Sequence, residues 1–157
     1  MTPREFLAEV VRPNVAEFHQ HYADMRHAHN AISAVDALAA HIYAWCLAHA
    51  PHEIVGSRDD SAYRAALASQ NAEFGLLRDI AKAQKHVHLT QGNPKVSTAA
   101  QVNARPIGFG QGPYGGGRYG GPPQVVVDLN SGGFQYVESI VKASLNFLEA
   151  EMERVGL

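Results

Sequence analysis

Cysteine is almost absent from this sequence: Cys46 is the single one among 157 residues. A disulfide framework and a cysteine-rich zinc site are therefore excluded. Neither sign of charge dominates, since 13 basic and 15 acidic side chains give a formal net charge of −2. This balance supplies no bulk attraction to nucleic acid, although a local basic patch still can. The apolar stretches are interrupted by His and Asp, and the first residues lack the apolar run of a signal peptide. We therefore expect a cytoplasmic protein without a membrane span.

Glycine is missing from the first 55 residues, and its distribution indicates how the chain is organised. Eleven of the fourteen glycines and five of the eight prolines lie between Gly92 and Gly133. Because both residues disfavour helix interiors, this predicts a helical block, then a β or irregular segment, then a final helix. We predict a mainly α fold, an up-and-down helical bundle in a single domain covering 1–157. A β/Gly-rich insertion at 91–130 carries a small β-hairpin before the last helix.

Apolar residues recur at three- and four-residue spacing along the helical block, which predicts helices that each bury one face. Pro13 is expected to end the first of them, because proline in a helix interior removes a hydrogen bond and clashes with the preceding turn. The predicted helices cover residues 3–11, 14–50 with a bend near Asp24, 62–69, 72–87 and the segment after the turn 130–133.

Two parts of the insertion are rich in β-branched residues and predict paired strands. The run 125–127 is the clearer one, and 99–109 supplies the partner, in which Pro106 suits only an edge position. Residues 110–123 are too rich in glycine to pack, which predicts a mobile hairpin tip. Contact of this tip with nucleic acid is a minor alternative, because it holds one arginine.

The most informative polar pattern lies at the end of the helix predicted over 72–87. Arg78 and Lys85 differ by about 20° in direction around the helix axis, and so do Asp79 and His86. The helix therefore presents a basic line beside a line of His and Asp. Asp79 and His86 are two turns apart, roughly 10 Å. Any partner of His86 must then come from another helix or another subunit.

The segment Arg-Asp-Ile-Ala-x-x-x-Lys-His at 78–86 follows an alanine-rich helix with His-Asn-Ala-Ile-Ser-Ala at 29–34. Together they resemble uncharacterised bacterial proteins related to HEPN domains, over about residues 15–90 and the last helix. Those proteins are helical bundles that usually dimerise, and many are RNases of defence or toxin systems with a doubled Arg-x4–6-His motif. The resemblance implies a homodimer in which Arg78 stabilises the scissile phosphate and His86 is the general acid/base. It also implies metal-independent cleavage that leaves a 2′,3′-cyclic phosphate.

The spacing of the two motif residues departs from the family pattern. Seven residues separate Arg78 from His86, one more than the motif allows, so their side chains lie about 80° apart around the helix. Lys82 or Lys85 can take the cationic role, or a distorted helix end can place Arg78 on the same side of the helix as His86. Asn30 on the long helix can supply a polar partner. The predicted site consists of Arg78 and His86 for catalysis, and of Asn30, Asp79, Lys82 and Lys85 for binding RNA or a nucleotide.

The same residues also fit a structural role. Arg78 and Asp79 can bridge neighbouring helices, and cations such as Lys85 and His86 are favoured at a helix end by about 0.3–1 kcal/mol. The alternative function is a non-catalytic interaction module whose polar face is covered by a subunit or a protein partner. An open cleft lined by Arg78 and His86 and doubled across a two-fold axis would favour the RNase. Hydrogen bonds to both residues from within the fold, or a surface that covers them, would favour the module.

Histidine is abundant, with nine in the chain. The pairs 19/21 and 27/29 differ by about 200° around a helix, so neither pair can chelate one metal. His86 and His88 can bind one metal ion together only if the chain becomes extended there. No His-x3-His pair occurs, and Cys46 lies on the apolar face of its helix. A metal site assembled from different helices is the minor alternative, and we expect no metal and no other cofactor.

Overall fold

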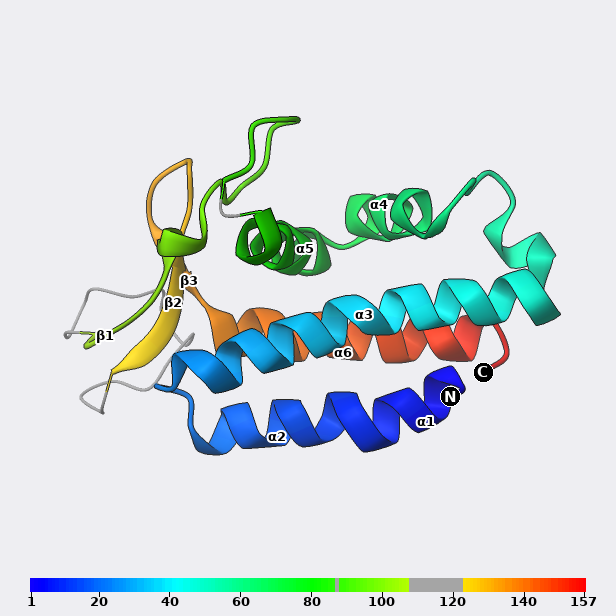
Figure 1. The fold of residues 1–157 in the computed structure, drawn as a ribbon, viewed down its shortest axis with the longest axis horizontal. Helices are drawn as coiled ribbons and strands as arrows, with labels where there is room; N and C mark the ends of the chain where they lie inside the picture. The colour runs from blue at the N-terminus through cyan, green and yellow to red at the C-terminus, as the bar shows by residue number, and fades with distance from the viewer. Residues whose placement is uncertain (87, 108–122) are drawn as a thin grey trace.

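The computed structural model describes residues 1–86, 88–107 and 123–157, so Val87 and most of the predicted hairpin tip lie outside the described residues. The chain folds as a helical bundle with a small antiparallel sheet before the last helix (Figure 1), which confirms the predicted fold class. Its elements are α1 (Pro3–Phe6), η1 (Leu7–Val11), α2 (Arg12–Gln20), α3 (Met25–His49), η2 (Pro51–Ile54), α4 (Asp60–Gln70), α5 (Ala72–His86), η3 (Ala99–Gln101), β1 (Val102–Arg105), β2 (Gln124–Asp128), β3 (Phe134–Tyr136) and α6 (Val137–Arg154).

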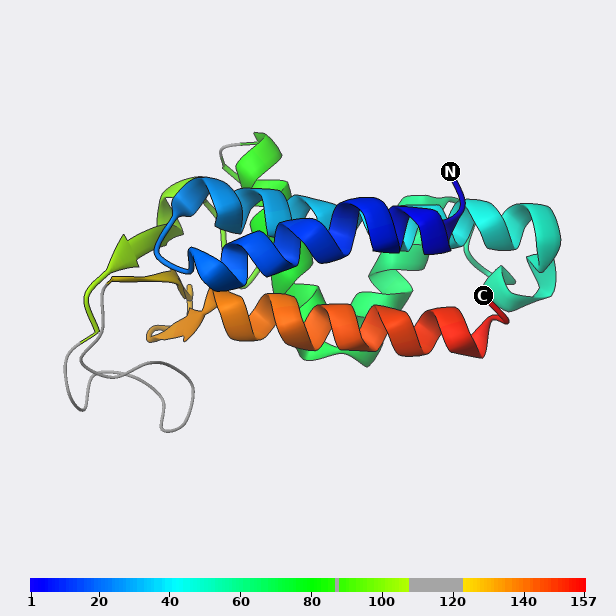
Figure 2. The ribbon, with the colours of Figure 1, turned by 90° about the horizontal axis from the view of Figure 1, so that it is seen from below.

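Three long helical segments run side by side: α1 to α2, α3, and α6 (Figures 1 and 2). α3 is central, since it contacts α2, α4, α5 and α6. α4 and α5 form a helical pair that packs on α3 and α6 and crosses them, as Figure 2 shows. Both termini lie at one end of the bundle and the sheet lies at the other (Figure 1). α5 ends near the sheet, since it contacts η3, the turn directly before β1.

The buried faces of the helices agree with the predicted apolar spacing. α3 is long and apolar enough to cross a membrane by length and composition alone, but half of its most apolar stretch is buried within this bundle. The residues at this spacing that the structure buries are Ala28, Ile32, Val35, Ala39, Ile42 and Cys46 on α3, Phe74, Leu77, Ile80 and Ala81 on α5, and Val137, Ile140, Val141, Leu145, Leu148, Met152 and Val155 on or directly after α6.

Pro13 does not end the first helix, so that part of the sequence prediction is wrong. The helical path continues to Gln20 through η1, a π-helical turn in which an N–H bonds to the carbonyl five residues earlier. The side-chain amide of Asn14 donates to the Val10 carbonyl (2.8 Å). In a regular α-helix the proline ring clashes with the carbonyl four residues before it. The wider π turn relieves that clash and keeps the path helical.

The break between α2 and α3 falls at residues 21–24, near the predicted bend. Asp24 is the N-cap of α3, where its carboxylate accepts the N–H groups of Arg26 (2.7 Å) and His27 (3.2 Å). These two bonds satisfy donors that the first helical turn cannot pair itself. The chain can therefore reverse here and start the central helix.

The sheet has the order β1-β2-β3, with both pairs antiparallel. Ala104 of β1 lies opposite Val125 of β2, and β1 is an edge strand that ends directly before Pro106, as its missing N–H requires. The sequence does not predict β3, because it places the segment after the turn 130–133, which includes Tyr136, in the last helix. β2 is buried along most of its length, between β1 and β3.

Candidate functional site

An open pocket of about 590 Å³ lies at the end of α5. Asp79, Lys82 and His86 line it from α5, and His88 and residues 89–94 line it from the segment that follows. We call this hollow the α5 pocket. It combines a lysine, two histidines and a carboxylate in one place, and two of its α5 residues lie within one turn of the helix end.

The segment that closes the α5 pocket is held at its base by polar contacts. The Asp79 carboxylate accepts the Lys95 N–H (2.8 Å). From the far side, the Asn130 side-chain amide donates to the Pro94 carbonyl (2.8 Å) and to the Ser97 hydroxyl (2.7 Å), and its N–H donates to the Lys95 carbonyl (2.9 Å). These contacts fix residues 94–97 against α5. Asp79 therefore positions the wall of the pocket as well as lining it.

Lys82 is the lysine of the α5 pocket, and its side chain is half-buried. Burial lowers the pKa of Lys82, the positive charge of Arg78 lowers it further, and Asp79 opposes both effects. The negative charge of Asp79 thus does not offset the combined effect of burial and of the Arg78 charge on the Lys82 ammonium group. An anion in the pocket would offset this effect, because opposite charges at close range favour the charged form.

His86 and His88 lie on either side of the point where the chain leaves the helix. His86 is the last residue of α5, and His88 pairs with Thr98 in an isolated antiparallel bridge. Both side chains are exposed and both line the α5 pocket. The change from helix to extended chain allows two histidines at i, i+2 spacing to share one pocket. Among the described residues, no group of three His, Cys, Asp or Glu side chains is placed to hold a metal ion.

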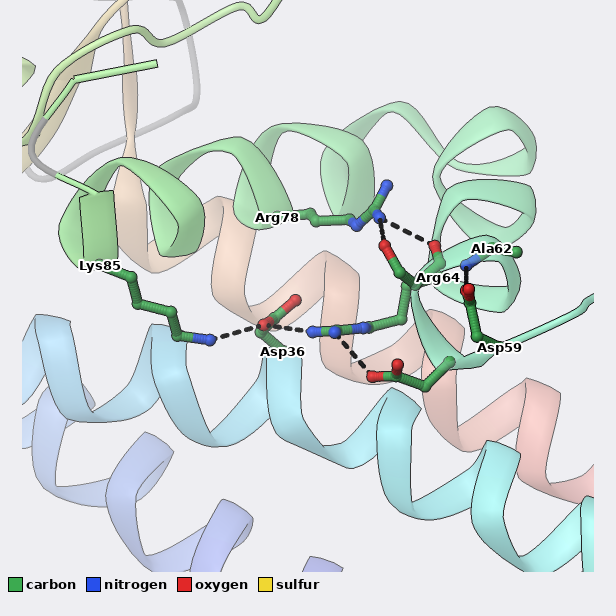
Figure 3. A network of polar contacts seen from close by, with 8 residues as sticks. Asp36, Asp59, Ala62, Arg64, Arg78 and Lys85 are labelled. Atoms are coloured by element: carbon green, nitrogen blue, oxygen red, sulfur yellow. Dashed lines mark hydrogen bonds and ion pairs between the residues drawn. The ribbon is translucent and has the colours of Figure 1, made fainter. Parts of the chain in front are cut away.

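Arg78 faces a different part of the molecule. Its side chain points toward α4, where Nη2 donates to the carbonyl (2.9 Å) and the hydroxyl (3.3 Å) of Ser61 (Figure 3). The residue is only 9% exposed. Burial lowers the pKa of Arg78 and the nearby Arg64 charge adds to this, while Asp36 opposes it. Arg78 thus ties α5 to α4, and the structure does not bring it to the α5 pocket with His86.

Lys85 belongs to a buried ion-pair cluster that sequence reasoning missed. Asp36 of α3 is 2% exposed and lies 3.0 Å from Nη1 of Arg64 and 3.5 Å from Nζ of Lys85 (Figure 3). Arg64 also pairs with Asp60 at 2.8 Å. The one available signal was an aspartate within the most apolar helix, since a buried carboxylate needs charged or hydrogen-bonded partners. Lys85 is therefore directed to α3.

Asn30 is the remaining predicted site residue. It is exposed on α3, six residues before Asp36 and about 120° away from it around the helix. In the described part of the chain, no hydrogen bond or ion pair links Asn30 to α5. The structure thus brings Asp79, Lys82 and His86 together in one pocket and places Arg78, Lys85 and Asn30 elsewhere.

The predicted site residues of α5 accordingly divide into two groups with different surroundings. Arg78 and Lys85 contact α4 and α3, whereas Asp79, Lys82 and His86 line an open pocket. Comparisons with protein-family models, with curated proteins and with solved structures give no match. The chemistry of the α5 pocket is therefore the basis for inferring function.

Proposed function

We propose that this protein binds RNA through the α5 pocket. The observation that carries the proposal is the convergence of Lys82, His86 and His88 on one open pocket. Lysine contacts to phosphates supply most of the affinity of many nucleic-acid-binding proteins. Histidine can add a second positive charge, because it gains a proton near neutral pH. The resemblance to HEPN-related proteins favours RNA among the phosphate-bearing ligands.

The same groups can support metal-independent cleavage of the bound RNA. One neutral histidine takes the proton of the ribose 2′-hydroxyl while that oxygen forms a bond to phosphorus. The other histidine, protonated, gives its proton to the departing 5′-oxygen as the phosphorus–oxygen bond breaks. The products are a 2′,3′-cyclic phosphate and a 5′-hydroxyl. Lys82 stabilises the charge on the phosphate, which is the role that the resemblance gave to Arg78.

Cleavage is tested with labelled tRNA and single-stranded RNA in EDTA. The wild type is compared with His86→Ala, His88→Ala and Lys82→Ala, and with His52→Ala as a control. His52 is an exposed histidine in η2, which follows the end of α3 that lies away from the sheet (Figure 1). We expect cleavage by the wild type and the control, and its loss in the three pocket variants.

Two other outcomes would revise the proposal. Binding of a 2′-O-methyl RNA without cleavage of the natural RNA would leave an RNA-binding protein and remove the catalytic step. Cleavage that persists in all three pocket variants would contradict a site in the α5 pocket. Arg78→Ala is not a useful probe of chemistry, because it removes the contacts of a buried side chain with Ser61.

A non-catalytic interaction module is the second candidate, and one observation favours it. Arg78 is buried and its Nη2 donates to the carbonyl and the hydroxyl of Ser61, as a structural role requires. In that function a protein partner covers the α5 pocket, and the folded protein does not bind RNA. Membership of the HEPN-related proteins, a role in a defence or toxin system and cytoplasmic location remain predictions from the sequence.

A further inference from the structure

We propose that residues 89–94, the loop over the α5 pocket, read an unpaired nucleobase through the side chains of Gln91 and Asn93. The inference rests on the RNA-binding function proposed above and extends it from phosphate recognition to base recognition. It assigns Lys82 to the RNA backbone and the loop to the base. In this arrangement, one wall of the α5 pocket contacts the charged phosphate and the other wall distinguishes the bases.

The position of this loop relative to Lys82 is fixed by the contacts at its base. Asp79 holds the Lys95 N–H, and Asn130 holds the carbonyls of Pro94 and Lys95. At the other end of the segment, the Leu89 N–H donates to the Ser97 carbonyl (2.7 Å). A loop tied at both ends keeps its tip over the pocket. Its side chains can therefore act as a preformed recognition surface.

The tip of the loop carries side chains suited to a base edge. Thr90, Gln91 and Asn93 are exposed and line the α5 pocket. Within the part of the chain that the structure describes, their side chains make no hydrogen bond. A carboxamide offers donors and an acceptor in one plane, which matches the edges of bases. Gly92, between the two amides, has φ +76°, which lets the chain turn without strain.

The character of the pocket favours edge recognition in single-stranded RNA. Bases in single strands have free Watson–Crick edges, whereas the major groove of an RNA duplex is too narrow for side chains. No Phe, Tyr or Trp is among the described residues that line the α5 pocket, so the only rings available for stacking there are those of His86 and His88, which the proposed function places at the phosphate. Its volume lies within the range of about 300–1,000 Å³ typical of small-ligand pockets. One nucleotide is the expected occupant.

The test measures the affinity of four fluorescent 2′-O-methyl homopolymers, one for each base, at several salt concentrations. The methyl group prevents cleavage during the measurement. We expect the wild type to favour one base by about tenfold. Gln91→Ala combined with Asn93→Ala should remove this preference and leave the salt dependence unchanged. Lys82→Ala should weaken binding to all four homopolymers alike. It should also lower the slope of the logarithm of the binding constant against the logarithm of salt concentration by about one, because one phosphate contact is lost.

Gln135→Ala is the matched control, because Gln135 is an exposed amide on β3 outside the α5 pocket. It should keep the wild-type preference. Equal binding of the four homopolymers by the wild type would overturn base reading while leaving RNA binding intact. A preference that survives the double substitution would overturn the assignment to Gln91 and Asn93. Absence of binding to every homopolymer would contradict the proposed function itself.

Discussion

Arg78 and Lys82 lie one turn apart on α5, yet only Lys82 is available to a ligand. Arg78 is buried and donates to Ser61, whereas Lys82 lines the α5 pocket. The sequence places both cations on the same helix and shows nothing of what packs against each. Their different surroundings come from α4, which covers the side of α5 that carries Arg78. The electrostatic state of Lys82 in turn depends on Arg78.

The lowered pKa of Lys82 predicts that RNA binding is accompanied by proton uptake. A phosphate beside Lys82 favours the charged ammonium and raises its pKa. At pH values just below the ordinary lysine value of 10.5, part of the free protein lacks this proton and regains it on binding. Calorimetric titration with a 2′-O-methyl oligoadenylate in two buffers of different ionisation enthalpy measures the uptake. Lys82→Met should abolish it, and the same uptake in Lys82→Met would refute the assignment.

Asp36 is predicted to be the residue on which stability most depends in the ion-pair cluster that it forms with Arg64 and Lys85. Asp36→Asn removes the buried carboxylate that pairs with Arg64 and Lys85, while Arg64 keeps its pair with Asp60. We therefore expect a loss of about 1–3 kcal/mol. Lys85→Met should cost only about 0–1 kcal/mol, because the Lys85 side chain is 57% exposed and lies 3.5 Å from the carboxylate. Urea unfolding of both variants measures the free energy of unfolding. Similar losses in the two variants would contradict this ranking.

At the scale of elements, α4 and α6 are joined by a buried carboxylate far from the α5 pocket. The Tyr63 hydroxyl donates to Glu151 (2.6 Å), and Arg154 donates to the same carboxylate from Nε (2.7 Å) and Nη2 (2.9 Å). Burial alone would raise the pKa of Glu151, but the hydrogen bonds from Arg154 and Tyr63 outweigh it and leave the pKa lowered. This junction therefore depends on an ionised Glu151.

The lowered pKa of Glu151 predicts a loss of stability in acid. The unfolded chain takes up this proton at a higher pH than the folded protein does, so the contribution is complete above the ordinary value of 4.5. It is lost as the pH falls through the lowered folded value. Urea unfolding between pH 7 and pH 3 should show the wild type approaching Glu151→Gln in stability. A difference in stability between the wild type and Glu151→Gln that does not change over this pH interval would contradict a lowered pKa of Glu151.

The sequence predicted the elements where one local rule governs them. Apolar spacing located the faces of α3, α5 and α6, and the density of glycine and proline located the insertion. The helix end at Pro13 was wrong, because the π-helical turn η1 accommodates the ring and a rule about proline alone does not include it. β3 has only three residues and forms by pairing with β2, a contact that local spacing does not reveal.

For the candidate site, the sequence could predict only that its residues lie on one helix. Asp79, Lys82 and His86 were all among the predicted residues, but their separation from Arg78 and Lys85 depends on the packing of α3 and α4. The loop that completes the α5 pocket is held by Asn130, which lies more than thirty residues away in sequence. Its role therefore required the structure. Contacts of this kind link the sheet end of the bundle to the end of α5.

At the scale of the whole molecule, the expected homodimer remains a prediction. Sedimentation equilibrium tests it directly, because a dimer has twice the mass of the 17.0 kDa chain. We expect the dimer mass at micromolar concentration. A monomer across the whole concentration range would contradict the oligomeric state that the HEPN resemblance implies. RNA binding by one α5 pocket does not require the dimer.

The central claim is that RNA binds in the α5 pocket, and fluorescence anisotropy with a labelled single-stranded RNA tests it most directly. Lys82→Glu reverses the charge in the pocket, and Lys142→Glu reverses an exposed charge on α6 outside it. Both variants change the net charge equally, so they separate a local site from general attraction. We predict that the wild type and Lys142→Glu bind RNA and that Lys82→Glu does not. Equal binding by Lys82→Glu and Lys142→Glu, or no binding by the folded wild type, would contradict the claim.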